Sequence, residues 1–209
     1  MIARYRQARH YSLLACEPLC IEDYGLQAEA FTSPPKWHLA HTSWFFETFL
    51  LKPFLLGYRT LDERYGFLFN SYYNGVGAQF GRAQRGLLSR PTVEDIRAYR
   101  AHVDREMEGL LADVDHPQRE TVLARSRLGI EHEQQHQELL LMDIKHVLGS
   151  NPLHPAYQRR SVTPSRPKPS RWVPFAGGVA EIGHRGQGFA FDNEGPCHQV
   201  LLDDYELSD

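Results

Sequence analysis

Apolar residues recur every three or four positions through most of residues 1–150, and this period predicts helices. Residues 2–16 carry a loose version of the pattern. A sharper start follows at Ser33, a residue type that favours the N-cap, with two prolines in the first turn after it. The helix predicted from this start includes residues 37–51 without a breaker and ends before Pro53.

Two more helices are predicted after a long irregular segment at residues 61–90, which is rich in Gly, Tyr, Asn and Arg. Thr92 and Asp95 form a variant capping box at the start of the third helix. Its apolar positions are Ile96, Tyr99, Val103, Met107 and Leu110. The last helix is predicted over residues 117–148, with Gly149 as its C′ residue. Four helices of this length predict a mainly α fold, an antiparallel four-helix bundle.

The pattern changes after residue 150. Residues 151–171 hold five prolines and a cluster of Arg and Lys, a composition typical of a surface linker. In residues 172–209, short apolar runs between turn residues predict two or three β-strands, with a turn at Gly177-Gly178. So few strands cannot bury a core alone. We therefore expect residues 172–209 to pack on the helical domain or to begin a further domain.

Composition excludes several classes of protein. Hydrophobic residues make up 42% of the 209 residues and charged residues 23%, a balance that can bury a core. A net charge of -3 argues against a general nucleic-acid or membrane surface role. Neither a membrane-spanning run nor a signal peptide is evident, so we expect a cytoplasmic protein. The three cysteines do not form a disulfide framework, and reduced thiols are expected.

Histidine carries the candidate chemistry, with 11 residues in the chain. His132 and His136 are four residues apart, which on a helix separates them by one turn and about 40° of rotation. Leu128 and Leu139 share that side of the helix, so both imidazoles are expected to face the core, where unpaired polar groups are costly. A pair placed in this way on a bundle helix indicates metal binding.

A third ligand must come from another helix, and residues 37–41 supply His38 and His41. His41 is followed by Trp44 and Phe45, which marks its face as packed, whereas His38 is nearer the helix start and is expected at the surface or in support of a ligand. Three neutral imidazoles suit Zn, Fe, Cu or Ni, and open coordination positions would fit a catalytic site.

A zinc protease is the competing interpretation, because residues 132–136 match the pattern H-E-x-x-H, in which the Glu is the general base. The extended metzincin pattern needs a Gly and then a His, but Leu139 and Met142 occupy those positions. A Glu ligand further along the helix is also hard to find. The context therefore disfavours a protease.

Several longer stretches resemble one enzyme family, the ergothioneine-biosynthesis sulfoxide synthases, also called hercynine oxygenases. The helical part contains KWHLAHTSWFFETFLLKP, FNSYYNGVG, RGLLSRPTVEDIRAYRAHVD and EHEQQHQELLLMDIKH. The tail FAGGVAEIGHRGQGFAFDNEGPCHQVLLDDYELSD resembles the opening of that family's second domain, which is similar to the formylglycine-generating, C-type-lectin-like fold. The resemblance implies a DinB-like metal-binding bundle at 1–150, a linker at 151–171 and the first part of a lectin-like domain at 172–209.

The activity implied by this resemblance is that of an iron(II) enzyme. It would use dioxygen to join the sulfur of cysteine or γ-glutamylcysteine to C2 of the hercynine imidazole, and would oxidise that sulfur to a sulfoxide. By motif position the iron ligands fall on His41, His132 and His136. Glu138 matches the acid of the family's H-x-x-x-H-x-E pattern, and its offset suits support of another group rather than ligation.

Substrate contacts are implied in the same way. Gln135 falls where the family contacts the hercynine imidazole. Arg82 and Arg85 resemble an R-x-x-R pair that binds the carboxylates of the thiol donor, which suits the guanidinium fork, and Arg90 is a competing candidate. Full-length relatives take a tyrosine, thought to be a proton donor, from their second domain, and Tyr205 lies too early for that role.

The chain stops soon after the second domain begins, so iron binding is expected more firmly than turnover. Two alternatives to the sulfoxide synthase remain open. One is a non-catalytic metal-binding bundle or a DinB-like thiol transferase that uses the same three histidines. The other is a structural module whose histidines bind nothing.

Overall fold

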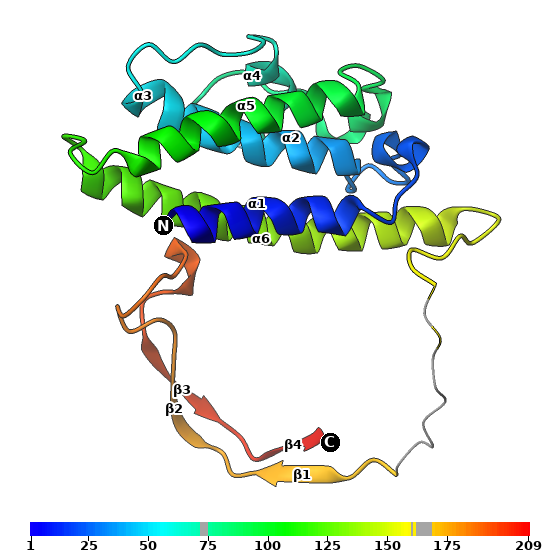
Figure 1. Ribbon diagram of the computed structural model, residues 1–209. Coiled ribbons are helices and arrows are strands. Elements are labelled where there is room, and N and C mark those ends of the chain that lie inside the picture. The colour runs from blue at the N-terminus through cyan, green and yellow to red at the C-terminus, as the bar shows by residue number, and fades with distance from the viewer. Residues whose placement is uncertain (72–74, 160, 162–168) are drawn as a thin grey trace. The chain divides into compact units, whose positions relative to one another are not determined.

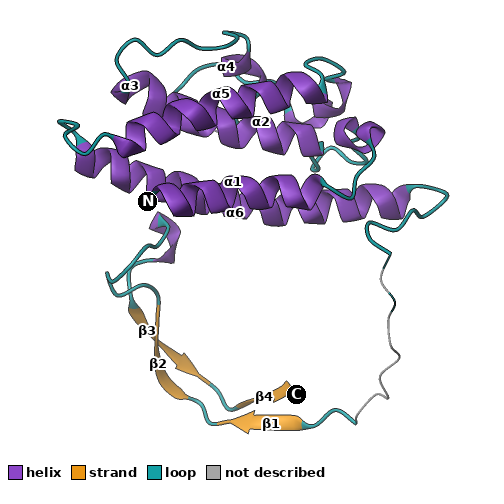
Figure 2. Cartoon of the chain, in the orientation of Figure 1, coloured by secondary structure: helices purple, strands orange, loops and turns teal. Residues whose placement is uncertain are grey.

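The computed structural model describes residues 1–71, 75–159, 161 and 169–209, and the chain divides into two units, Met1–Arg159 and Arg160–Asp209. The division falls inside the predicted linker at 151–171, of which residues 160 and 162–168 lie outside the described part. The first unit is helical and the second holds two small β-sheets (Figures 1 and 2). None of the helices described is both long enough and apolar enough to cross a membrane.

Four long helices build the first unit. They are α1 (Ile2–Cys16), α2 (Pro35–Phe46), α5 (Val93–Ala112) and α6 (Arg119–Ser150), and two short ones, α3 (Lys52–Phe54) and α4 (Tyr65–Leu68), lie in the connection after α2. Turns of 3-10 helix cover Ile21–Gly25 and Arg82–Leu87. Helix α1 packs along α6, and α2 packs against both α5 and α6. The predicted mainly helical fold is therefore present in residues 1–150.

The directions of the helices differ from the expected antiparallel order. Helices α1 and α6 run the same way, as do α2 and α5, whereas α2 and α6 are antiparallel (Figure 1). Side-chain contacts give the same result for α1 and α6, because Arg4 meets Glu131 and, further along both helices, Ser12 meets Gln137. The long connection between α2 and α5 returns the chain to the end at which α2 starts, so these neighbours are parallel. The spacing of apolar residues predicts where helices form, but it does not predict the path of the connection between α2 and α5.

Helix α2 is central, and every residue from Pro35 to Phe46 is buried. Its N-cap is Pro34 rather than the predicted Ser33, whose backbone N–H instead donates to Asp143 on α6. The predicted single helix to Leu51 is also wrong in detail, because a π-helical segment occupies Glu47–Leu51. Such a segment inserts an extra residue into a turn and commonly occurs beside functional sites.

The other predicted helices hold with small corrections. Thr92 and Asp95 form the capping box of α5, and the five predicted apolar positions of that helix are all buried. Helix α6 begins at Arg119 and ends at Ser150, so Gly149 is inside its last turn rather than after it. Leu128, expected beside the histidines, is 39% exposed. The core of α6 is formed by other residues, including Val122, Ile130, Leu140 and Ile144.

The second unit contains β1 (Trp172–Phe175), β2 (Gly178–Ile182), β3 (His198–Leu202) and β4 (Tyr205–Ser208), together with a 3-10 turn at Asp192–Glu194. Strand β1 pairs with β4 and β2 pairs with β3, both antiparallel. Gly177 joins β1 to β2, and a Cβ there would lie 2.3 Å from the carbonyl oxygen of Leu202, which only glycine avoids. None of the four strands contains a buried residue. Two or three strands were predicted and four are present, and Gly178, predicted in the turn, is the first residue of β2. The lectin-like assignment stays a prediction.

Candidate metal centre

Three histidines from two antiparallel helices meet inside the first unit. His41 comes from α2, and His132 and His136 come from successive turns of α6. One ring nitrogen from each lies within 4.8 Å of the others, and the ring centroids are 4.6 to 5.1 Å apart. His41 and His132 are buried and His136 is partly exposed. The three side chains are therefore close enough to bind one ion.

Each of two rings is oriented through its second nitrogen. His41 Nδ1 lies 2.6 Å from the backbone carbonyl oxygen of Phe69, which follows α4. A carbonyl only accepts, so Nδ1 carries the proton and Nε2 keeps its lone pair. His136 Nδ1 lies 2.9 Å from Nδ1 of His38. Metal-binding imidazoles characteristically use their second nitrogen in this way, because the contact fixes both ring orientation and tautomer.

His38, expected at the surface or in support of a ligand, has the supporting position. It is 3% exposed, and its Nε2 lies 3.0 Å from Oδ2 of Asp143. The Ser33 backbone N–H donates to the same oxygen over 2.8 Å. Asp143, which was not predicted, thus joins α2 to α6 behind the histidine cluster.

The third ring, His132, provides a test of whether the cluster fits a metal. Its Nδ1 is buried and has no hydrogen-bond partner among the described residues. An unpartnered buried polar atom costs free energy, and an ion shared with two neighbouring imidazoles would satisfy such a site. The Phe45 ring stacks on His132 with centroids 4.4 Å apart, which covers this side of the cluster with apolar surface.

The protonation states also suit a metal, because metals bind neutral imidazole. Burial lowers the pKa of His132 to about 4. Burial is also the main reason that the pKa of His41 and that of His136 lie well below the ordinary value, and the neighbouring imidazoles lower both further. At neutral pH all three rings are uncharged, so each can offer a nitrogen lone pair to a metal ion.

Aromatic rings enclose the His41 side of the cluster. Trp37 stacks on His41 with centroids 4.5 Å apart, and Trp44 stacks on it at 5.4 Å. The Arg85 guanidinium lies 3.3 Å from the Trp37 ring centroid, within range of a cation–π interaction. These planar groups hold the His41 ring between two indoles, so its orientation is fixed by packing as well as by its hydrogen bond.

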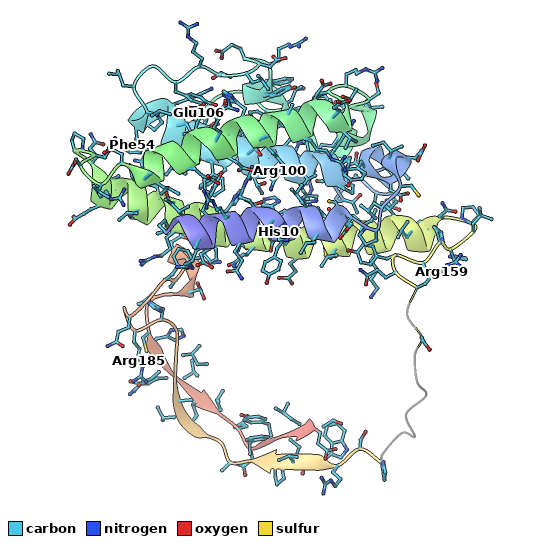
Figure 3. The ribbon with its side chains drawn as sticks, viewed as in Figure 1. His10, Phe54, Arg100, Glu106, Arg159 and Arg185 are labelled. Atoms are coloured by element: carbon cyan, nitrogen blue, oxygen red, sulfur yellow. The ribbon has the colours of Figure 1, made fainter. Side chains whose placement is uncertain are left out.

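Glu133, the middle acid of the H-E-x-x-H pattern, belongs to a different cluster. It is fully buried and accepts hydrogen bonds from Arg9 on α1, Arg100 on α5 and Ser12 on α1, over 2.9, 2.9 and 2.6 Å. Figure 3 labels Arg100 on α5. Burial opposes ionisation, but the two guanidiniums and the hydroxyl lower the pKa of Glu133 to about 2. A carboxylate bound in this way cannot serve as the general base of a zinc protease, so that interpretation is wrong.

The residues implied to bind substrate occupy different environments. Arg85 is 3% exposed and donates to Ser33 and Ser71, while Arg82 is partly buried in the same 3-10 turn. Gln135 and Arg90 are exposed, as is Glu138. Their proposed roles stay predictions. Part of the resembling stretch FNSYYNGVG, residues 72–74, lies outside the described residues.

Sequence reasoning missed Asp143 and the pair Arg9 and Arg100. Asp143 had a usable signal, because it follows His136 by seven residues and so shares its helix face. The arginines had none, since Arg9 and Arg100 are separated from Glu133 by 124 and 33 residues.

Comparison with known proteins gives one result for this unit. The model of a family described as the DinB superfamily matches residues 4–140, which include all three histidines of the cluster. No curated protein matches the chain.

Proposed function

The chain belongs to the DinB superfamily, and from that premise we propose that its helical unit is the metal-binding part of an iron(II)- and dioxygen-dependent sulfoxide synthase. The observation that carries the metal centre is the convergence of three ring nitrogens, from His41, His132 and His136, within 4.8 Å of one another. The identity of the metal and the reaction are supported by the resemblance of the sequence motifs to the hercynine oxygenases.

The donor set is compatible with this chemistry. Three neutral imidazoles suit iron(II) among other first-row metals, and they would leave about three positions of an octahedral ion open. When bound, the ion would supply a common binding point for the two substrates and dioxygen. The chain's own residues hold the imidazoles in place, and the aromatic rings of Trp37, Trp44 and Phe45 keep water from the buried side of the cluster.

The proposed reaction balances without a further reductant. A thiol S–H bond and the hercynine C2–H bond break, a C–S bond forms, and the sulfur takes one oxygen atom. The second oxygen atom leaves as water with the two hydrogens, so the substrates supply all four electrons that reduce dioxygen. Hercynine and either cysteine or γ-glutamylcysteine are the proposed small-molecule partners, with Gln135, Arg82 and Arg85 as proposed contacts.

A redox-neutral thiol transferase is the alternative, and one observation favours it. The three histidines all lie inside the region matched by the family, residues 4–140, so a reaction that needs only this unit requires nothing from the β-sheets. Such an enzyme would bind metal and thiol but would consume no dioxygen. A non-catalytic metal-binding role gives the same metal content with no reaction at all.

The test uses the whole chain, purified without a histidine tag and reconstituted anaerobically with Fe(II). Metal content is measured by mass spectrometry, and dioxygen uptake is followed after adding hercynine with cysteine or γ-glutamylcysteine. We expect stoichiometric iron, dioxygen uptake and a sulfoxide product of the expected mass. Metal binding without dioxygen uptake would refute the sulfoxide synthase and leave the alternatives.

A matched pair of variants tests the ligand assignment. His136→Ala removes a proposed ligand, and we expect it to abolish stoichiometric metal binding. His146→Ala removes an exposed histidine from the same helix, ten residues further on, and should bind metal as the wild type does. Unchanged iron content in His136→Ala would show that His136 is not a ligand.

A further inference from the structure

A line of hydrogen bonds leads from the histidine cluster to a buried carboxylate. His136 Nδ1 lies 2.9 Å from His38 Nδ1, and His38 Nε2 lies 3.0 Å from Asp143 Oδ2. His136 and Asp143 are both on α6, seven residues or about 700° apart, so they share a face of the helix. His38 comes from α2 and bridges them. The line therefore crosses from α6 to α2 and back.

Only one arrangement of protons satisfies every contact in this line if His136 binds a metal. Its Nε2 must keep a lone pair for the ion, so its Nδ1 carries the proton and donates to His38. His38 Nδ1 must then be the acceptor, which leaves the proton of the neutral ring on Nε2. That proton is donated to Oδ2 of Asp143.

We infer that His38 and Asp143 are positioning residues that fix the ring orientation and the tautomer of His136, and so direct its Nε2 lone pair toward the metal. This inference rests on the metal centre proposed above. It extends the familiar carboxylate–histidine–metal arrangement by one additional imidazole. Neither residue touches the reacting atoms in this scheme.

The burial of Asp143 supports a role beyond packing. The residue is 1% exposed, its Oδ1 has no hydrogen-bond partner, and no Lys or Arg of the described residues pairs with it. Burying a carboxylate without a cation is costly. A divalent ion bound by His136 would place positive charge at the other end of the line and offset that cost. Glu133, ten residues earlier on α6, is neutralised by Arg9 and Arg100. A carboxylate with only a structural role would be stabilised more by an arginine of this kind than by a neutral imidazole.

The first readout is the tautomer of His136 in the metal-free protein, measured from the ¹⁵N chemical shifts of its ring. We expect the proton on Nδ1 in the wild type and a mixture of tautomers in His38→Ala. His38→Gln should restore the wild-type state, because its amide oxygen can accept from His136 while its N–H donates to Asp143. A wild-type ring protonated on Nε2 would overturn the inference.

The second readout is the affinity for Co(II), used as a spectroscopic probe and measured by competition with a chelator. We expect His38→Ala to bind about 10–100-fold more weakly and Asp143→Asn on the order of tenfold more weakly, with His38→Gln close to the wild type. Leu140→Ala is the control, since it opens a cavity in the same stretch of α6 and should lower the melting temperature without changing affinity.

The outcomes separate this inference from the function on which it rests. Wild-type Co(II) affinity in both His38→Ala and Asp143→Asn would overturn the inference and leave the metal centre intact. If His38→Ala does not fold by circular dichroism, Asp143→Asn and His38→Gln still decide it. A wild-type chain that binds Co(II) no better than His136→Ala would overturn both the role of His38 and Asp143 and the metal centre itself. Metal binding without dioxygen uptake would refute the sulfoxide synthase alone.

Discussion

The Glu133→Gln variant is expected to lose about 3–5 kcal/mol of folding free energy, because it leaves buried guanidinium groups without their counter-ion. Glu133 is fully buried and lies 2.9 Å from both Arg9 and Arg100. Arg9 keeps a second partner in Asp104, whereas no other carboxylate among the described residues pairs with Arg100. The amide oxygen of Gln can still accept hydrogen bonds, but its NH₂ group cannot accept from a guanidinium and the negative charge is lost.

The pKa of Glu133 gives a second route to the same magnitude. Its fall from an ordinary value of 4.5 to about 2 corresponds to about 3 kcal/mol at neutral pH. Because the folded-state pKa is the lower one, this stabilisation is fully present above about pH 4.5 and is lost as the pH falls toward 2. The wild type should therefore lose its advantage over Glu133→Gln in that range.

The measurement is urea unfolding at pH 7 and again between pH 5 and 3, with thermal melting as a check. A loss of this size would lower the melting temperature by about 6–20 °C in a chain of this length. Glu131→Gln is the control, since it makes the same change two residues earlier, in an exposed ion pair with Arg4 at 2.8 Å. That pair should contribute about 1 kcal/mol or less. Equal destabilisation by the two variants would refute the reasoning.

Three further experiments test other parts of the helical unit. Gly129→Ala should cost about 1–3 kcal/mol in urea unfolding, because a Cβ there would lie 2.5 Å from a phenylalanine ring of α2, whereas Gly149→Ala, with open space around it, should stabilise α6 by about 0.5–1 kcal/mol. Co(II) should quench tryptophan fluorescence, and Trp37→Phe should lose much of the quenching, because the Trp37 indole stacks on the proposed ligand His41. Equal quenching in the wild type and in Trp37→Phe would contradict this geometry. Iodoacetamide at pH 8 should label the exposed Cys20 and spare Cys16 in the native protein, because burial raises the pKa of Cys16 to about 12; mass spectrometry of the peptides decides it.

The hydrophobic period predicted those helices whose buried faces follow it. Helix α5 is the clearest case, since its capping box and its five apolar positions were all visible in the sequence. Helix α2 was located, but its conversion to a π-helical segment at Glu47 was not, because one extra residue in a turn leaves no mark on an apolar run. Helix directions were also beyond the pattern. They depend on where the connection between α2 and α5 leads, and that segment has no period of its own.

The metal centre was predictable to the extent that its chemistry is local. His132 and His136 sit at a spacing that points both rings one way, and the packed residues after His41 separated it from His38. The partner of His38 was harder to find. Asp143 is a single acid on a long helix with several others, and only its seven-residue offset from His136 distinguishes it. Once the tertiary fold brings α2 against α6, the contact is unambiguous.

Helix α6 contributes to two buried polar clusters, the three histidines and the ion pairs of Glu133. The positions of these clusters explain why the chain carries the H-E-x-x-H pattern although Glu133 cannot act as a protease base. Successive helical residues differ by about 100° in direction, so Glu133 points to a different side of α6 from His132. Arg9 and Arg100 lie on that other side and bind the carboxylate there. The ion pairs thereby fix the rotation of α6 about its axis, which also fixes where the imidazoles of His132 and His136 point. In a zinc protease the same acid must reach the metal-bound water. The nearest cations therefore decide the role of the acid, and those cations come from elements remote in sequence.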